Sequence, residues 1–410
     1  MPFPILAAAP APSTPLGPFA DSAVTWTTWI TLMAAVGLTV LAFAVAGPAA
    51  RRTAPAALTP VTVRIALAAA VLGLLAMPAV LSDLAHGASQ SGGYDYPAAW
   101  DSLYDGAGGL YSGLQVTLPP IGAVLLAGLA FPRVATGRAR PWLLGGALAA
   151  GAVALATAKF PTDASDGWGR TIFETGVWML HLFGGAIWIG GLTGLLLLAL
   201  PGGVPAAERG AFWSVVIRRF SAVAMGSVAA IALSGLFLYW EHVDGPGQLL
   251  TTMYGRVLGV KILIFGTLLL LGMANQFWLH PRIEALRAAG DQRPLRALLV
   301  RQFPALVAAE LLLVMTVLFV APFLHGSARN QAFQANAAAH ATSAAAPLPK
   351  IPAKQVSTST WAWGTAETLI VIAVMIAGYR VSGRLARSRT AAVTATLASR
   401  DPNPDDLVGA

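Results

Sequence analysis

Histidine and methionine are the residues of this chain best suited to bind a metal ion, since six His and nine Met occur and no Cys. Imidazole and thioether together favour Cu(I), whereas imidazole with carboxylate also accepts Cu(II). Only His181 lies well inside an apolar segment. It shares a helical face with Glu174, Trp178, Gly185 and Trp188, at 4-3-4-3 spacing. A face with a carboxylate, an imidazole and two indoles is not expected to contact lipid.

Three further histidines, His86, His242 and His325, fall at the ends of the second, sixth and eighth apolar segments. With methionines at similar depth or on the His181 helix, they complete a candidate copper-ligand set: His181, His86, His242, His325, Met179, Met253 and Met77. Histidines at span ends also have an ordinary role as amphipathic residues of the headgroup zone, and this alternative stays open. No HxxxH or MxxM pair occurs, so ligands from several helices would have to converge.

Ionisable residues inside a membrane are costly and often functional. Four lie inside apolar segments: Glu174, Lys261, Glu310 and Glu367. Glu310 lies at the depth of Asn275 on the preceding segment, and Arg219 is within reach of it. These residues form either a polar clamp between helices or a station on an ion or proton path. Arg256 is either a cation at a pore mouth or an interfacial anchor.

The elements that must position these residues are membrane spans, because 56% of the chain is hydrophobic and only 11% is charged. A span takes about 20 apolar residues. Nine segments qualify: 23–47, 62–82, 111–132, 141–158, 171–200, 219–239, 256–279, 303–324 and 361–379. The predicted fold is an all-α polytopic transmembrane bundle of about nine spans. Arginines cluster after the odd-numbered spans, which predicts an outer N-terminus and a cytoplasmic C-terminus.

The chain is expected to divide into a four-span region at 1–160 and a four-span core at 168–325. An external, mobile, low-complexity linker is expected at 326–360, a ninth span at 361–381 and a cytoplasmic tail at 382–410. Basic cytoplasmic loops account for the +8 charge, so no nucleic-acid partner is expected. No GxxxxGK[ST] loop occurs, which excludes an ATP-driven pump. A channel, a secondary transporter, a redox protein and an assembly factor remain.

Three ordered motifs mark residues 168–325. The first is W-x-x-H-L-x-G-x-x-x-W-x-G-G, from Trp178 to Gly191. The second is R-F-S at 219–221, followed by S-G at 234–235, and the third is T-x-Y-G-R-x-L-x-x-K, from Thr252 to Lys261. On these motifs the stretch resembles the copper resistance protein D (CopD) family.

This resemblance implies a multi-pass protein of the bacterial inner membrane that transports copper, inward from the periplasm, for copper homeostasis or resistance. It implies copper as cargo, the lipid bilayer as surroundings, a periplasmic CopC-like copper-binding protein as a partner, and no enzymatic activity. The glycine pairs at 184–185 and 190–191 are expected to permit close helix approach.

Two other functions stay open on the residues alone. A haem-binding membrane redox protein needs two axial ligands, often histidines, facing each other at one depth. His86, His242 and His325 are candidates for such a pair, whereas His181 has no histidine at its own depth. An assembly factor that delivers copper to a membrane oxidase would use the same residues as a transporter.

Overall fold

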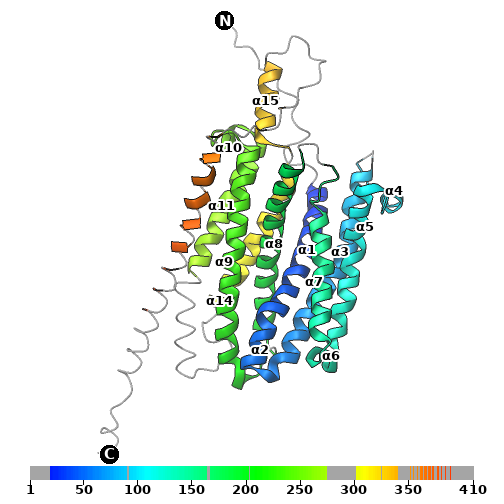
Figure 1. Ribbon diagram of the computed structural model, residues 1–410, viewed down its shortest axis with the longest axis vertical. Coiled ribbons are helices and arrows are strands. Elements are labelled where there is room, and N and C mark those ends of the chain that lie inside the picture. The colour runs from blue at the N-terminus through cyan, green and yellow to red at the C-terminus, as the bar shows by residue number, and fades with distance from the viewer. Residues whose placement is uncertain are drawn as a thin grey trace, which may run out of the picture.

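The computed structural model describes residues 19–89, 92–163, 167–202, 204–274, 302–324 and 326–339, with scattered residues between 351 and 388. Within these ranges every regular element is a helix (Figure 1). Seven helical segments are long and apolar enough to span a membrane. The all-α polytopic membrane bundle is therefore confirmed.

The seven segments coincide with predicted spans one, two, three, five, six, seven and eight. Predicted span four is α7 (Arg140–Thr157), whose 18 residues give about 27 Å of helix, slightly less than a bilayer core. Predicted span nine falls where only scattered residues are described. The count of nine spans remains a prediction.

Helices α1 (Phe19–Val40), α3 (Leu58–Ala88), α5 (Gly106–Ala127) and α7 form the N-terminal region. Helices α8 (Trp168–Ala199), α9 (Arg209–His242), α11 (Met253–Ala274) and α14 (Gln302–Val320) occupy the predicted core. Helix α1 packs against α3, α7, α8 and α14, so it joins the two groups (Figure 1). The Trp26 indole on α1 also donates to the carbonyl of Met315 on α14, at 2.9 Å.

Short elements connect these helices. A π-helical turn (Leu41–Ala46) and α2 (Gly47–Thr53) continue α1, and a 3-10 turn (Pro55–Ala57) leads into α3. Helix α4 (Tyr96–Asp101) precedes α5, and a 3-10 turn (Gly128–Ala130) and α6 (Pro132–Thr136) follow it. A 3-10 turn (Ala206–Glu208) precedes α9, and α10 (Gln248–Thr251) precedes α11. A 3-10 turn (Ala321–Phe323) ends α14 and leads to α15 (Ala328–Ala339).

Glycines set the crossing of α1 and α8. A Cβ built on Gly190 would overlap the backbone of Gly37, and one on Gly37 would overlap the carbonyl of Ala186. On the neighbouring face, Gly191 makes room for the ring of Phe220, and a Cβ on Gly184 would lie 3.0 Å from α9. The expectation that these paired glycines permit close helix approach is confirmed.

Two arginines stabilise the π-helical turn. An Arg140 Nη2 donates to the Ala42 carbonyl and an Arg219 Nη1 to the Ala44 carbonyl, each at 3.4 Å. Gly47 leaves the space that the buried Arg140 guanidinium fills. A π-turn disturbs the regular helical hydrogen bonding, so outside donors help to satisfy its carbonyls. These bonds tie α7 and α9 to the end of α1.

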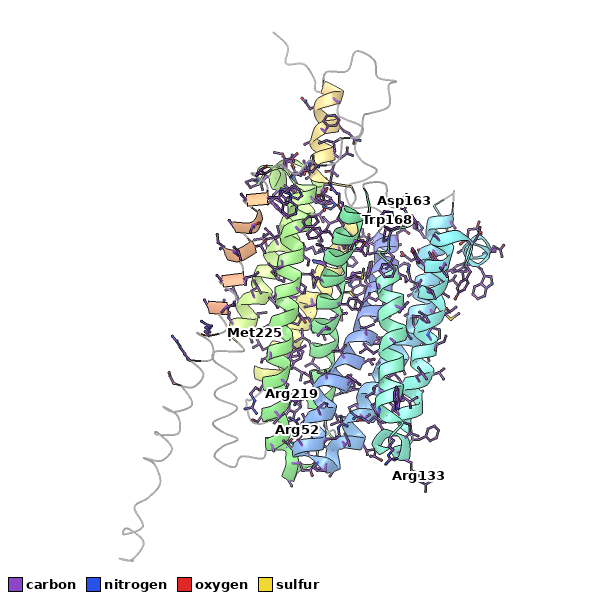
Figure 2. The ribbon with its side chains drawn as sticks, in the orientation of Figure 1. Arg52, Arg133, Asp163, Trp168, Arg219 and Met225 are labelled. Carbon is purple, nitrogen blue, oxygen red and sulfur yellow. The ribbon has the colours of Figure 1, made fainter. Side chains whose placement is uncertain are left out.

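The two ends of the bundle differ in charge. Figure 2 shows Arg52, Arg133 and Arg219 at one end, which we call the basic end, and Asp163 and Trp168 at the other, which we call the outer end. This placement agrees with the positive-inside rule, which puts the basic end in the cytoplasm. The orientation of the termini remains a prediction.

Part of the segment that was expected to be a mobile linker is helical. Helix α15 packs against α10 and α11, and Ala328 at its start is fully buried. The backbone N–H of Tyr254 donates to the side-chain oxygen of Gln331, at 3.0 Å. The described part of this segment is therefore docked on the core helices.

Reporter fusions test the orientation. Fusions at positions 55, 136 and 210, next to the basic end, should report a cytoplasmic location. Fusions near 95 and 248 should report an external one, because the basic loops are retained inside. A reversed location of the fusion at position 95, 136 or 210 would contradict the proposed topology.

Gly190→Ala tests the helix crossing. The added methyl group forces α1 and α8 apart, so the variant should lose about 1–3 kcal/mol of stability, measured by thermal unfolding in detergent. Gly176→Ala on the same helix is the matched control, because nothing lies within 4 Å of its Cβ position. Equal melting temperatures in the two variants would show that the crossing tolerates a wider spacing.

Candidate functional site

His181 reaches from α8 to α9. Its Nδ1 lies 3.0 Å from the Ser234 hydroxyl, and that hydroxyl lies 2.5 Å from the Ala230 carbonyl. A serine has one hydroxyl hydrogen, and the carbonyl can only accept, so Ser234 donates to Ala230 and accepts from the Nδ1–H of His181. In the neutral ring the lone pair then lies on Nε2. His181 is therefore held by one nitrogen and free to bind a metal through the other.

Helix α11 presents a matching face to this side of α8. The Phe265 ring meets the Trp188 ring edge-on at 6.2 Å, and Lys261 lies one turn above Phe265 on the same face. Gly235 on α9 faces the His181 ring, 4.0 Å from where its Cβ would be. His181 thus lies among α8, α9 and α11.

The thioether that shares the His181 face is Met33, which the sequence reasoning missed. The Met33 side chain is buried, and its terminal methyl lies 2.6 Å from where a Cβ of Gly185 would be. Gly185 is one turn from His181 on the same face of α8. The predicted ligand Met179 is two residues from His181, about 200° round the helix. In the sequence, the only indication that a side chain packs here was Gly185, the small residue that lies opposite Met33.

A network that we call the outer latch joins the outer ends of α8 and α9 to the segment after α14. Arg170 pairs with Glu174 at 2.6 Å and with Glu241 at 2.9 Å. Asp244 pairs with Arg329 of α15 at 2.8 Å and with Lys354 at 3.4 Å. Glu174 is one of the carboxylates that the sequence places inside an apolar segment. The structure pairs it with Arg170 on its own helix, and Glu367 lies outside the described residues.

Lys354 is the most connected member of the outer latch. Its ammonium donates to the carbonyl of Trp240 at 2.6 Å and of Val243 at 3.2 Å, and lies 4.7 Å from the centre of the Trp240 ring. Its own carbonyl accepts from Arg170. A lysine at the carboxyl end of a helix also meets a favourable dipole. The latch therefore closes over the outer end of α9.

His242 lies beneath the outer latch. Its Nδ1 is 2.8 Å from the Leu238 carbonyl, and its ring stacks on Tyr254 with centroids 5.7 Å apart. The flanking carboxylates, Glu241 and Asp244, are engaged by cations of the latch. Each flanking carboxylate thus has a cation on one of its oxygens, while the other Glu241 oxygen, Oε2, is buried without a hydrogen-bond partner among the described residues.

His86 lies in the N-terminal region, at the outer end of α3. Its Nδ1 is 3.2 Å from the Gly93 carbonyl, and its Nε2 is 3.3 Å from Asp21 Oδ2 at the start of α1. The Tyr94 hydroxyl, 3.5 Å from the other oxygen, donates to Asp21. The three outer histidines were expected to form one group. The structure places His86 and His242 on different helix pairs, and His325 lies outside the described residues.

The remaining predicted ligands do not extend these sites. Met77 packs against the main hydrophobic core, and Met253 begins α11 beside Tyr254. No three His, Asp or Glu side chains converge as a metal site in the part of the chain that the structure describes. Any copper site here must use fewer protein ligands, thioethers or water.

Glu310 is the buried carboxylate of the core. It is 4% exposed, and its Oε1 has no hydrogen-bond partner among the described residues. Its candidate partner Arg219 donates to Ala44 instead, and Asn275 lies outside the described residues. Arg256 donates to the Leu250 carbonyl at 2.8 Å and so caps α10, in agreement with an anchoring role.

The haem alternative needs two histidines that face each other. In the described ranges, the ring partners of His86, His181 and His242 are Tyr94, Trp178 and Tyr254. These described residues therefore supply no axial histidine pair.

The fold and these sites define a multi-pass helical membrane protein with isolated imidazoles as candidate metal ligands. Residues 214–324, from α9 to the end of α14, match the family model described as Copper resistance protein D (CopD). The match confirms the resemblance over these residues. The motif around His181 lies before the matched residues. Searches of curated proteins and of solved structures find no match.

Lys354→Met tests the outer latch. The variant loses the contacts to α9, so hydrogen exchange in residues 328–339 should speed up about 5–30-fold, as expected for a loss of roughly 1–2 kcal/mol. Lys159→Met is the matched control, because Lys159 also lies over an indole, 4.8 Å from the Trp178 ring, outside the latch. Equal exchange in the wild type and both variants would show that Lys354 does not hold the segment.

Proposed function

We propose that this protein transports copper across the bacterial cytoplasmic membrane, inward from the periplasm, for copper homeostasis or resistance. The observation that carries the proposal is His181, a membrane-embedded imidazole held through Nδ1 with Nε2 left for a ligand. The match of α9, α11 and α14 to the CopD family model supports copper as the transported metal. We infer that the protein moves its cargo without chemical conversion.

The ligands near His181 favour a soft ion. Imidazole with the thioether of Met33 suits Cu(I). Conduction requires a site that an ion can leave as well as enter. His181 is therefore proposed as a transient station rather than a storage site.

The other polar residues of the core are proposed to line the same copper path across the membrane. Glu310, buried with one unpartnered oxygen, is proposed as a station nearer the basic end, and Asn275 as its neighbour. The outer latch, over the end of α9, is proposed to be where a periplasmic CopC-like protein delivers the ion. Lys261 and Arg256 flank this outer route.

Copper uptake into proteoliposomes tests the role of His181. An Asn side chain places its NH₂ near the position of Nδ1 and lacks Nε2, so His181→Asn keeps the bond to Ser234 and loses the ligand. His181→Asn and His181→Ala should both lose at least about tenfold in flux, the rate factor that 1.4 kcal/mol represents. Ser234→Ala keeps Nε2 but removes the bond that orients the ring, so it should lose less flux than His181→Asn.

Near-normal uptake by His181→Asn, at matched expression and thermal stability, would reduce His181 to a structural bond between α8 and α9. A wild-type protein that binds copper but gives no uptake would instead support a delivery factor. Comparison of Cu(I), Cu(II) and Zn(II) identifies the transported ion. A purified protein without a Soret band would exclude bound haem.

A further inference from the structure

We propose a second metal site, outside the CopD-matched region, in which His86 Nε2 and Asp21 Oδ2 hold a Cu(II) ion at the outer end of α1 and α3. The site does not depend on transport through the core, and it goes beyond the proposed function. It gives the N-terminal helices a role in capturing the divalent ion from outside. The argument starts from the hydrogen bonds of the imidazole.

The tautomer of His86 leaves a lone pair directed at a carboxylate. The Gly93 carbonyl can only accept, so Nδ1 of His86 carries the hydrogen in that 3.2 Å contact. In the neutral ring, Nε2 is then unprotonated and lies 3.3 Å from Asp21 Oδ2. Two acceptors face each other, and either a second proton or a cation must sit between them.

The separation of these two atoms admits either occupant. A hydrogen bond between imidazolium and carboxylate is usually about 2.7–2.9 Å long, and this pair lies 3.3 Å apart. Divalent ions of this class bind nitrogen and oxygen at about 2.0–2.2 Å. Two neighbouring ligands of a square-planar ion, the geometry typical of Cu(II), are then about 2.8–3.1 Å apart. A small closing of the pair therefore lets both atoms bind one Cu(II) ion.

The surrounding groups orient both ligands as in known metal sites. Metal-bound histidines commonly donate their other N–H to a carbonyl, and bound carboxylates accept a hydrogen bond from a neighbour. Gly93 supplies the carbonyl, and Tyr94 donates to Asp21 Oδ1.

The chemistry of the pair selects a divalent ion of the copper type. One imidazole and one carboxylate suit Cu(II), which binds such ligands more tightly than other first-row divalent ions. The side chains of His86 and Asp21 are 30% and 21% exposed, so an ion can reach them and water can complete its coordination. The adjoining stretch, residues 83–110, contains Asp83, Asp95, Asp101 and Asp105 and no Lys or Arg. Its negative charge raises the local concentration of cations.

His242 is the internal comparison. Its Nδ1 is also tied to a carbonyl, but the neighbouring carboxylates Glu241 and Asp244 pair with Arg170, Arg329 and Lys354. Those cations compete with a metal ion for the same oxygens. The two histidines thus share a tautomer, and the structure places a carboxylate oxygen against Nε2 at His86, whereas the carboxylates that flank His242 are paired with latch cations.

Cu(II) titration of the purified full chain in lipid nanodiscs tests the site. The wild type should bind one Cu(II) whose electron paramagnetic resonance spectrum shows coupling to imidazole nitrogen. His86→Ala should abolish this signal, and Asp21→Asn should weaken binding at least about tenfold. Tyr94→Phe loses only the orienting hydroxyl and should weaken Cu(II) binding by at most about 100-fold. His242→Ala is the matched control and should bind as the wild type does.

Unchanged Cu(II) binding in both His86→Ala and Asp21→Asn would overturn the proposal, as would equal losses in His86→Ala and His242→Ala. Circular dichroism and thermal unfolding, matched between variants, exclude misfolding as the cause of a loss. Copper uptake by His181→Asn is measured separately. If His181→Asn keeps its copper flux while Cu(II) binding still depends on His86, only the proposed transport role of His181 fails. If His181→Asn loses flux while His86→Ala and Asp21→Asn bind Cu(II) as the wild type does, only the proposed His86 site fails.

Discussion

The contact between the backbones of α1 and α8 at Gly37 and Gly190 is the constraint on which the rest of the structure depends. Lipid provides no hydrophobic force between membrane helices, so their association relies on close packing. This crossing attaches the N-terminal helices to the core helices. It also places Met33 against Gly185, one turn from His181. The same small residues that allow the contact therefore bring a thioether from α1 to the imidazole face of α8.

The two ends of the bundle are held by opposite means. At the basic end, arginines donate to helix carbonyls: Arg140 and Arg219 to the π-helical turn, and Arg64 to the carbonyls of Leu197, Leu200 and Pro201. At the outer end, carboxylates are paired with the cations of the outer latch. The arginines at the basic end donate to uncharged carbonyls, so their positive charge is not balanced there. Around α9 at the outer end, cations and carboxylates largely neutralise each other. The unpaired carboxylates of the outer surface lie instead near α3 and α4.

A common hydrogen-bonding pattern links the three described histidines. His86 and His242 donate through Nδ1 to a backbone carbonyl, and His181 donates through Nδ1 to a hydroxyl that is itself committed as a donor. In each neutral ring, Nε2 keeps the lone pair. The surroundings then decide the chemistry: a carboxylate lies against Nε2 at His86, a buried face of α8 surrounds His181, and carboxylates already paired with cations flank His242. The pattern explains how single histidines can differ in metal binding without a shared motif.

The sequence alone determined the class of the fold, because runs of about 20 apolar residues cross a membrane only as helices. It also located His181 and the glycine pairs, which lie within one continuous motif, and the CopD resemblance, which rests on three motifs in order along the chain. It could not group the ligands. Asp21 and His86 are 65 residues apart, and Met33 and Gly185 are on different helices, so only packing brings them together. The tertiary structure likewise decided that Glu241 and Asp244 pair with Arg170 and Arg329, because ion pairs form between the nearest charges in space, whatever their separation along the chain.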